Sequence, residues 1–320
     1  MAIIKNVSII FTSIFFESLP FLLLGALISS IIETFVSDET MAKIIPKNKV
    51  LGSLVGIILG FFLPACDCAV IPVAKRLIKK KVPLNVAISF MLASPIINPV
   101  VLLSTYYAFY KTNPNIFWGR LALGIIVALI IGIIMGIIYG KKKVIINDTN
   151  EEKCCCHHHH HNEVIFDDID NEDLEDDECE YCHNKFISII KHTAMDFYEV
   201  SKYLIIGALI ASVIQVTLPR TVLTFFNNNN FVSIIVLMIF AYLISLCSTS
   251  DSFVGKSLLS SFTNDSIIAY LLLGPMIDVK NTFVLLGNYK KSFVLVLISL
   301  IFIAVFICSI VWGIIIWKNF

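Results

Sequence analysis

Cysteines lie beside polar residues at two places in this sequence. Cys66 and Cys68 flank Asp67, and Cys247 precedes Ser248. Thiolates are soft ligands that suit zinc, copper(I) or another thiophilic centre. We therefore expect the three thiols to meet around one thiophilic atom. The alternative is that two of them only pack as small hydrophobic side chains.

Prolines interrupt two apolar stretches at matching positions. Residues 93–99 read Ala-Ser-Pro-Ile-Ile-Asn-Pro, and residues 273–279 read Leu-Gly-Pro-Met-Ile-Asp-Val. A proline removes a helix hydrogen bond, and in lipid this defect persists only where protein or a water-filled cavity satisfies the backbone. Paired interruptions are typical of a substrate site at the membrane midplane, although a kink is the simpler interpretation. The predicted site residues here are Ser94, Pro95, Asn98, Pro99, Pro275 and Asp278.

Ionisable residues inside apolar stretches are costly and commonly functional. Glu17, Asp278 and Lys280 lie in such stretches, and Glu199 lies near the start of one. Glu17 and Glu199 are candidates for carrying a coupling proton, or else interfacial carboxylates at helix ends. Asp278 and Lys280 are too close in sequence to face each other on a helix, so their pairing requires unwound backbone. Asp251 is a further candidate for substrate binding or charge coupling.

A separate acidic segment, residues 147–184, contains other candidate ligands. It holds 14 acidic residues and one basic residue. Because Cys/His-rich tracts bind metals, we predict that it binds zinc or another soft or borderline cation. The alternative for the acidic run is a solvated linker. The five consecutive histidines could be read as a purification tag, but their position in the middle of the chain argues against this. The predicted metal ligands are Cys154, Cys155, Cys156, His157, His158, His159, His160, His161, Cys179, Cys182 and His183.

The composition indicates that a membrane holds these residues. The chain has 320 residues, of which 57% are hydrophobic and 15% charged, against about 25% charged in soluble domains. A soluble globular enzyme, a disordered protein and a disulfide scaffold are excluded. A spanning helix needs about 20 apolar residues, so we predict an all-α polytopic membrane protein with about eight spans. These are Ser8–Phe35, Val50–Pro72, Leu84–Tyr110, Phe117–Gly140, Phe197–Val216, Phe231–Cys247, Ser266–Leu286 and Ser292–Trp317.

The two halves of the chain resemble each other. Glu17 followed by residues 24–28 (LGALI) matches Glu199 followed by residues 206–210 (IGALI), and the cysteine and proline motifs follow in the same order. We predict two repeats with broken helices at the midplane, residues 1–146 and 185–320, joined by the acidic segment 147–184. Four spans per repeat give parallel repeats. If a broken segment re-enters the membrane without crossing it, the repeats are inverted.

Charge predicts the orientation. The acidic segment carries one basic and 14 acidic residues, a net charge of −13, and the remaining 23 basic and 10 acidic residues give +13. With eight spans, a cytoplasmic N-terminus puts fifteen basic residues inside and eight outside, which the positive-inside rule favours. We therefore predict a cell-membrane protein with both termini and the acidic segment in the cytoplasm. Lys290 and Lys291 then lie outside, which the positive-inside rule disfavours.

The motifs also resemble a known family. The sequence FFLPACDCAVIP at residues 61–72, followed by ASPIINP, looks like the predicted permease family of bacteria and archaea, which includes efflux permeases for trivalent organoarsenicals. Residues 247–254 and 274–281 are similar to its second-half motifs. The resemblance covers nearly the whole chain except the acidic segment. It implies a permease without specifying the substrate.

We therefore predict a permease that exports a small thiophilic solute, such as a trivalent organoarsenical or a soft metal species. No phosphate-binding loop appears, so we expect no ATP hydrolysis, no enzymatic activity and no required cofactor. Its expected partners are the solute, the lipid bilayer and a second copy or another membrane subunit, and no nucleic acid. One alternative is a thiol-redox protein using Cys66 and Cys68, although redox pairs usually read C-x-x-C. Another is a non-transporting, metal-responsive membrane subunit.

Overall fold

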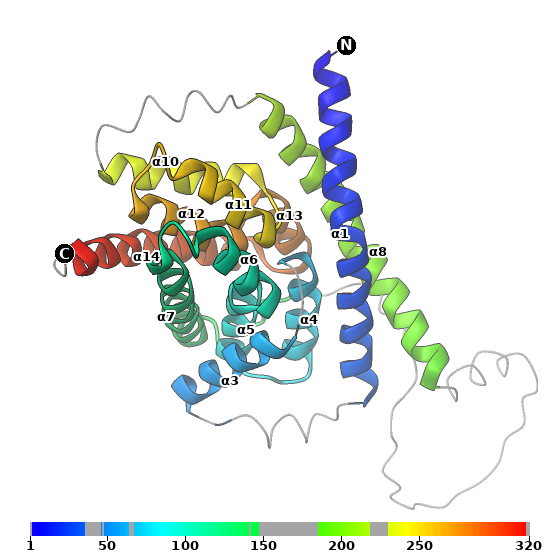
Figure 1. Ribbon diagram of the computed structural model, residues 1–320. Coiled ribbons are helices and arrows are strands. Elements are labelled where there is room, and N and C mark those ends of the chain that lie inside the picture. The colour runs from blue at the N-terminus through cyan, green and yellow to red at the C-terminus, as the bar shows by residue number, and fades with distance from the viewer. Residues whose placement is uncertain are drawn as a thin grey trace, which may run out of the picture.

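The computed structural model describes residues 2–35, 46, 48–63, 67–140, 142–146, 185–217 and 230–317. Within these ranges the chain is helical apart from turns and one isolated backbone bridge between Ile145 and Tyr289, which confirms the all-α class (Figure 1). The helices are α1 (Ala2–Phe35), α3 (Lys49–Phe62), α4 (Asp67–Lys79), α5 (Leu84–Ile97), α6 (Pro99–Phe109), α7 (Pro114–Ile138), α8 (Lys185–Thr217), α10 (Asn230–Ile244), α11 (Ser248–Leu258), α12 (Asn264–Met276), α13 (Val279–Asn288) and α14 (Lys291–Trp317).

Six of the eight predicted stretches are long and apolar enough to cross a membrane. They are α1, the pair α5 and α6, α7, α8, the pair α12 and α13, and α14. The other two stretches are each divided. Val50–Pro72 comprises α3 and the beginning of α4, and Phe231–Cys247 comprises α10 and the residues before α11. The polytopic membrane class is thus confirmed, with six candidate crossings among the described residues.

The helix pair α3 and α4 turns back on itself. Helix α3 packs parallel to α5, since Gly52 lies against Asn85 and Gly60 lies against the backbone of Ser94. Glycine at these positions allows the two backbones to approach closely. Because α5 begins beside the beginning of α3, helix α4 must bring the chain back. The two short helices therefore form a hairpin.

The pair α10 and α11 has the same form in the second half. Helix α11 runs antiparallel to α12, because Asp251 lies beside Gly274 and Gly255 lies beside Leu271. Helix α10 also packs on α12. The chain thus enters along α10 and returns along α11 before α12 begins.

Helices at corresponding places in the two halves run antiparallel. In α7 and α14, Gly119 lies against Trp312 near the start of one helix and the end of the other. At the opposite end, the ring of Tyr139 lies 5.3 Å from that of Phe293. In α1 and α8, the Ser29 hydroxyl donates to Asp196, with an oxygen–oxygen distance of 3.0 Å, and the middle of α1 packs on Ala208 and Ala211.

These directions define two opposite faces of the molecule. At the insert face, α1, α4, α7 and α13 end and α3, α5, α8 and α14 begin. At the terminal face, α6, α8, α11 and α14 end and α1, α7, α10 and α12 begin. Segment 147–184 connects α7 to α8 and therefore joins the insert face. The prediction that both termini share a face with this segment does not agree with the helix directions.

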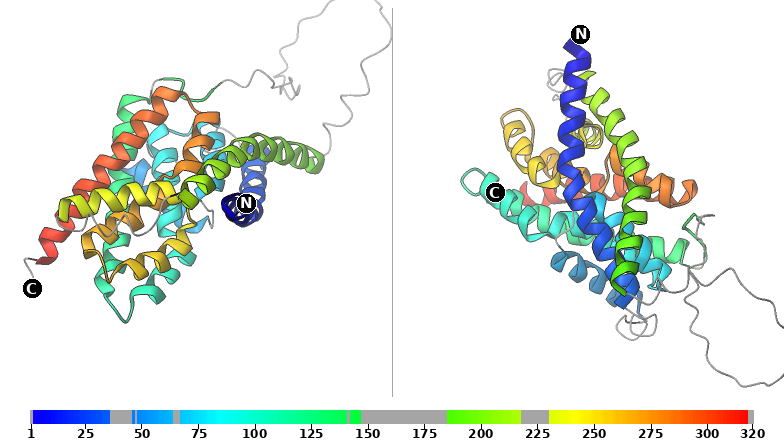
Figure 2. Two further views of the ribbon diagram at one scale, coloured as in Figure 1. Left: turned by 90° about the horizontal axis from the view of Figure 1, so that it is seen from above. Right: turned by 90° about the vertical axis from the view of Figure 1, so that its right-hand side faces the viewer.

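Helices α1 and α8 lie side by side along one flank, and the other helices form a bundle beside them (Figures 1 and 2). The flank contacts the bundle through α4 and α13, where Gly25 lies against Ala69 and Gly207 lies against the backbone of Lys280. In the bundle, α5 and α12 are buried on nearly all sides. The candidate site lies where the flank meets the bundle.

Candidate functional site

Three helices begin at one point in the interior of the molecule. Asp67 is the first residue of α4, Ser248 is the first residue of α11, and Asp278 caps the N-terminus of α13. The first turn of a helix has unpaired N–H groups and a partial positive charge. Accordingly, the Asp278 carboxylate accepts a hydrogen bond from the backbone N–H of Asn281, with an oxygen–nitrogen distance of 2.7 Å. These helix starts favour negative charge at the site.

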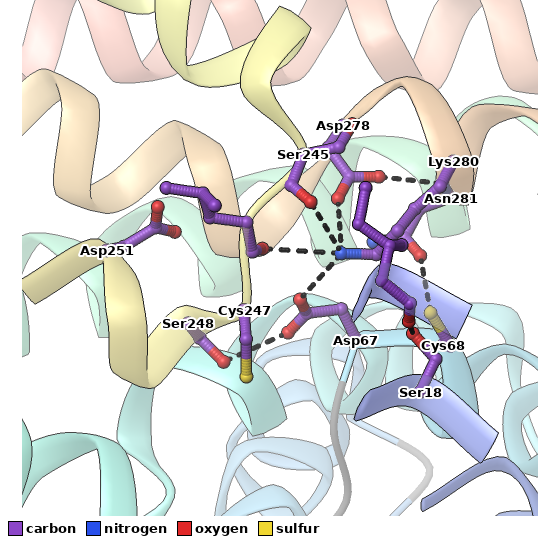
Figure 3. A network of polar contacts seen from close by, with 12 residues as sticks. Ser18, Asp67, Cys68, Ser245, Cys247, Ser248, Asp251, Asp278, Lys280 and Asn281 are labelled. Atoms are coloured by element: carbon purple, nitrogen blue, oxygen red, sulfur yellow. Dashed lines mark hydrogen bonds and ion pairs between the residues drawn. The ribbon is translucent and has the colours of Figure 1, made fainter. Parts of the chain in front are cut away.

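Lys280 lies between two carboxylates (Figure 3). Its Nζ is 2.9 Å from Oδ2 of Asp278 and 4.0 Å from Oδ2 of Asp67. All three side chains are buried. The Lys280–Asp278 contact is possible because α12 ends at Met276 and α13 begins only after extended backbone at residues 277 and 278. The break in the helix therefore produces the ion pair.

The connection between α10 and α11 supplies further partners. Lys280 Nζ donates to the carbonyl oxygens of Ser245 and Leu246, both at 3.3 Å. Ser245 has a φ of 51°, a left-handed conformation that is uncommon for a residue other than glycine. Such backbone persists where the surrounding structure enforces it. The turn thus directs two carbonyl groups toward the buried ammonium group.

Two predicted thiols face the same pocket. Cys68 is buried, with Sγ 3.4 Å from Oδ1 of Asn281, and Cys247 is half-buried, with Sγ 3.4 Å from the Thr249 hydroxyl. Cys66 lies outside the described residues, so the meeting of three thiols stays a prediction. The pocket is lined by Ile14, Glu17, Ser18, Phe21, Asp67, Cys68, Ser245, Leu246, Cys247 and Lys280.

Arg120 forms a second buried polar cluster that the sequence analysis missed. It is 0% exposed and donates to the hydroxyls of Thr105 and Ser252, at 2.7 and 2.8 Å, and to the Ser248 carbonyl at 3.3 Å. The sequence analysis counted Arg120 with the eight basic residues outside, although it lies within the predicted span Phe117–Gly140. Its charge within an apolar stretch is the signal that could have identified it, because ionisable residues inside spans are costly and usually functional.

The two polar clusters are connected. The Ser248 hydroxyl donates to Asp67 Oδ1 at 3.2 Å, and the Ser248 carbonyl accepts from Arg120. One residue further along α11, the Ser104 hydroxyl of α6 donates to the Thr249 carbonyl at 2.8 Å. The first turn of α11 therefore contacts both halves of the chain.

Several predicted residues lie away from the pocket. Ser94, Pro95, Asn98 and Pro99 form the α5–α6 break, where the Asn98 side chain accepts from the N–H of Val100 at 3.0 Å. These residues and Pro275, which is buried near the end of α12, do not line the pocket.

The two predicted coupling glutamates occupy different environments. Glu17 is exposed on α1 and lines the pocket. Glu199 on α8 instead pairs with Lys75 at 3.1 Å, beside the 2.6 Å ion pair between Arg76 and Asp196. These pairs connect α4 to the flank.

The predicted metal ligands of segment 147–184 all lie outside the described residues. They are Cys154 to Cys156, His157 to His161, Cys179, Cys182 and His183. Within the described part of the chain, no three His, Cys, Asp or Glu side chains are grouped so as to hold a metal ion. Metal binding by this segment stays a prediction.

A family model and two known proteins match this chain over most of its length. A family model described as a predicted permease matches residues 3–314. The chain is 38% identical over 304 residues to "UPF0718 protein YcgR" of Bacillus subtilis (strain 168), covering 92% of this chain and 93% of the relative. It is 34% identical over 286 residues to the "Putative two-component membrane permease complex subunit" of Streptococcus mutans serotype c (strain ATCC 700610 / UA159), covering 89% and 88%. No solved structure matches the chain.

Proposed function

Since the chain belongs to the predicted permease family, we propose that it moves a small solute across the membrane through the pocket between its flank and its bundle. The observation that carries the proposal is the buried Asp67–Lys280–Asp278 cluster at the beginnings of broken helices. Charged groups are costly inside a membrane and usually mark a solute or ion pathway. Broken helices with sites at their ends are a recurring feature of secondary transporters.

We propose export of a small thiophilic solute, such as a trivalent organoarsenical or a soft metal species. The Cys68 and Cys247 thiols on the pocket wall support this class, because sulfur ligands select soft centres. The sequence contains no phosphate-binding loop, so an ion gradient or downhill flow would drive export. By analogy with the relative named as a complex subunit, a partner membrane subunit is part of the proposal.

Accumulation assays test this function directly. The chain is expressed in cells that lack their own arsenical exporters, which are then exposed to methylarsenite, arsenite or zinc. We expect lower intracellular methylarsenite than in cells with an empty vector. Equal accumulation of all three solutes with and without the protein would overturn the proposed substrate class. Absence of any solute movement would favour a non-transporting subunit.

We further propose that the two halves are inverted repeats. Two observations support this arrangement. Corresponding helices run antiparallel, and each half contains three candidate crossings. Each hairpin enters and leaves by the same face, so it adds no crossing. After three crossings the chain is at the opposite face, and the second half therefore begins there and runs in the reverse direction. The pseudo-twofold axis would then lie in the membrane plane, as in other inverted-repeat transporters.

Basic residues indicate that the insert face is cytoplasmic. Among basic residues whose side chains are described and that lie outside the apolar stretches predicted from the sequence, eleven are near the insert face and three, Lys5, Lys111 and Lys256, are near the terminal face. The positive-inside rule therefore favours cytoplasmic placement of segment 147–184 and external placement of both termini. The eleven are Lys49, Lys75, Arg76, Lys79, Lys80, Lys81, Lys142, Lys143, Lys191, Lys290 and Lys291.

Cysteine labelling in whole cells tests this orientation. In a variant with all native cysteines replaced by serine, Lys111→Cys and Lys290→Cys are introduced separately. Because the two residues lie at opposite faces, we expect a membrane-impermeant maleimide to label Lys111→Cys in intact cells and Lys290→Cys only after the cells are opened. The reverse pattern would reverse the orientation, and labelling of both in intact cells would contradict the inverted arrangement.

A further inference from the structure

Asp251 is a buried carboxylate with incomplete bonding. It is 2% exposed on α11, and its Oδ1 accepts from the Tyr270 hydroxyl at 2.9 Å. Its Oδ2 has no hydrogen-bond partner among the described residues and lies beside Gly274, where a Cβ atom would be 2.8 Å from it. The glycine provides room for this oxygen without giving it a donor.

The charges around Asp251 do not balance. Arg120 on α7 and Asp278 and Lys280 on α13 act electrostatically on Asp251, Asp67 on α4 acts on Arg120, and all four are buried. With Asp251, the site holds three carboxylates and two cations, a net charge of −1. Tyr270 on α12 is an uncharged neighbour, and Glu17 is exposed at the pocket. An unbalanced charge is unfavourable inside a protein, and a proton would neutralise it.

The ion pairs indicate which carboxylate carries the excess charge. Lys280 lies within 4.0 Å of both Asp67 and Asp278. Arg120 instead donates to two hydroxyls and a carbonyl, and its Nε has no partner in the described part of the chain. Neither cation forms an ion pair with Asp251 in the described structure. The uncompensated charge therefore falls on Asp251.

We propose that Asp251 holds a proton on Oδ2 in this conformation and is the proton-coupling carboxyl group of the permease. The protonation follows from the local charges, whereas the coupling role rests on the proposed function. When the site rearranges, the Asp251 O–H bond breaks, the proton passes to water, and the resulting carboxylate pairs with Arg120. Nothing is oxidised or reduced in this step. The Nε of Arg120, which has no hydrogen-bond partner among the described residues, is the group available for that pairing.

Infrared spectroscopy of the purified protein in lipid nanodiscs tests the protonation. We expect the carbonyl stretching band of a protonated carboxylic acid at neutral pH in the wild type. The band should be lost in Asp251→Asn, which keeps the size and neutrality of the protonated group, and retained in Glu17→Gln, which changes an exposed carboxyl group at the same pocket. Absence of the band from the wild type, or its persistence in Asp251→Asn, would overturn the proposal. A band that appears only after sodium or potassium is removed would also overturn it, because the site would then hold a metal cation.

Vesicle assays test the coupling separately. With methylarsenite as the probe, Asp251→Asn should lower accumulation driven by a pH gradient by a larger factor than it lowers solute exchange at equal pH. Unchanged gradient-driven accumulation in the variant would overturn the coupling role. Failure of the wild type to exchange methylarsenite would contradict the proposed substrate, while the infrared result would still decide the protonation of Asp251.

Discussion

Replacing Lys280 with methionine should destabilise the protein by about 3–5 kcal/mol, the usual cost of removing one partner from a buried ion pair. Methionine can fill much of the volume of the lysine stem, but it supplies no charge. Asp67 and Asp278 would then lose their shared cation, and the carbonyl groups of Ser245 and Leu246 would lose a donor. Thermal unfolding in detergent, followed by the loss of the monodisperse chromatographic peak, measures the effect.

Two further variants distinguish charge imbalance from poor packing. Lys280→Met combined with Asp278→Asn removes both charges of the 2.9 Å pair and should recover part of the lost stability. Lys256→Met makes the same substitution at an exposed position of α11, where surface changes usually alter stability by less than about 0.5 kcal/mol. Equal losses from Lys280→Met and Lys256→Met would show that the Lys280 cation does not stabilise the buried cluster.

Cys68→Ser and Cys247→Ser should each slow methylarsenite export at least about tenfold. Mutating a residue that only hydrogen-bonds to a metal ligand already lowers metal affinity or activity by about tenfold or more, and a direct ligand should matter at least as much. Serine replaces the thiol with a hydroxyl of similar size and so removes the soft sulfur ligand. Both cysteines line the pocket, and each sulfur has a polar neighbour that positions it. Initial rates of efflux from preloaded cells, corrected for protein abundance, measure the change.

Cys308→Ser is the matched control for the thiol variants. Cys308 is a half-buried free cysteine on α14 and does not line the pocket. Its replacement should leave the efflux rate within about twofold of the wild type, because it removes the same sulfur away from the solute. If all three variants export methylarsenite at the wild-type rate, the solute does not bind through these thiols.

The sequence predicted the class of fold and the positions of the helix breaks. In lipid the backbone must satisfy its own hydrogen bonds, so apolar stretches of spanning length can form few structures other than helices. Paired proline motifs then mark where these helices break. Six of the predicted stretches are candidate crossings, and the second break occurs at Ile277 and Asp278 as the motif suggests. The family followed from the same motifs.

The directions of the short helices depended on tertiary contacts. Hydropathy does not distinguish a helix that crosses from two half-length helices that return, because both have the same apolar composition. The parallel packing of α3 on α5, through Gly52 and Gly60, identifies the hairpin. Because of the hairpin, each half has three candidate crossings instead of the four predicted. Segment 147–184 and the termini are then at opposite faces of the molecule and not at the same face.

The residues of the candidate site were also predicted in part from the sequence and in part found only in the tertiary structure. The sequence by itself indicated Asp67, Cys68, Cys247, Asp278 and Lys280 as candidate site residues, because polar residues at helix interruptions are unusual in an apolar chain. Only the tertiary structure separated Glu199 from the pocket, by its ion pair with Lys75, and placed Arg120 in the interior near Asp251. The physical reason is that the cost of a buried charge depends on its neighbours in space, and these neighbours come from helices far apart in the sequence.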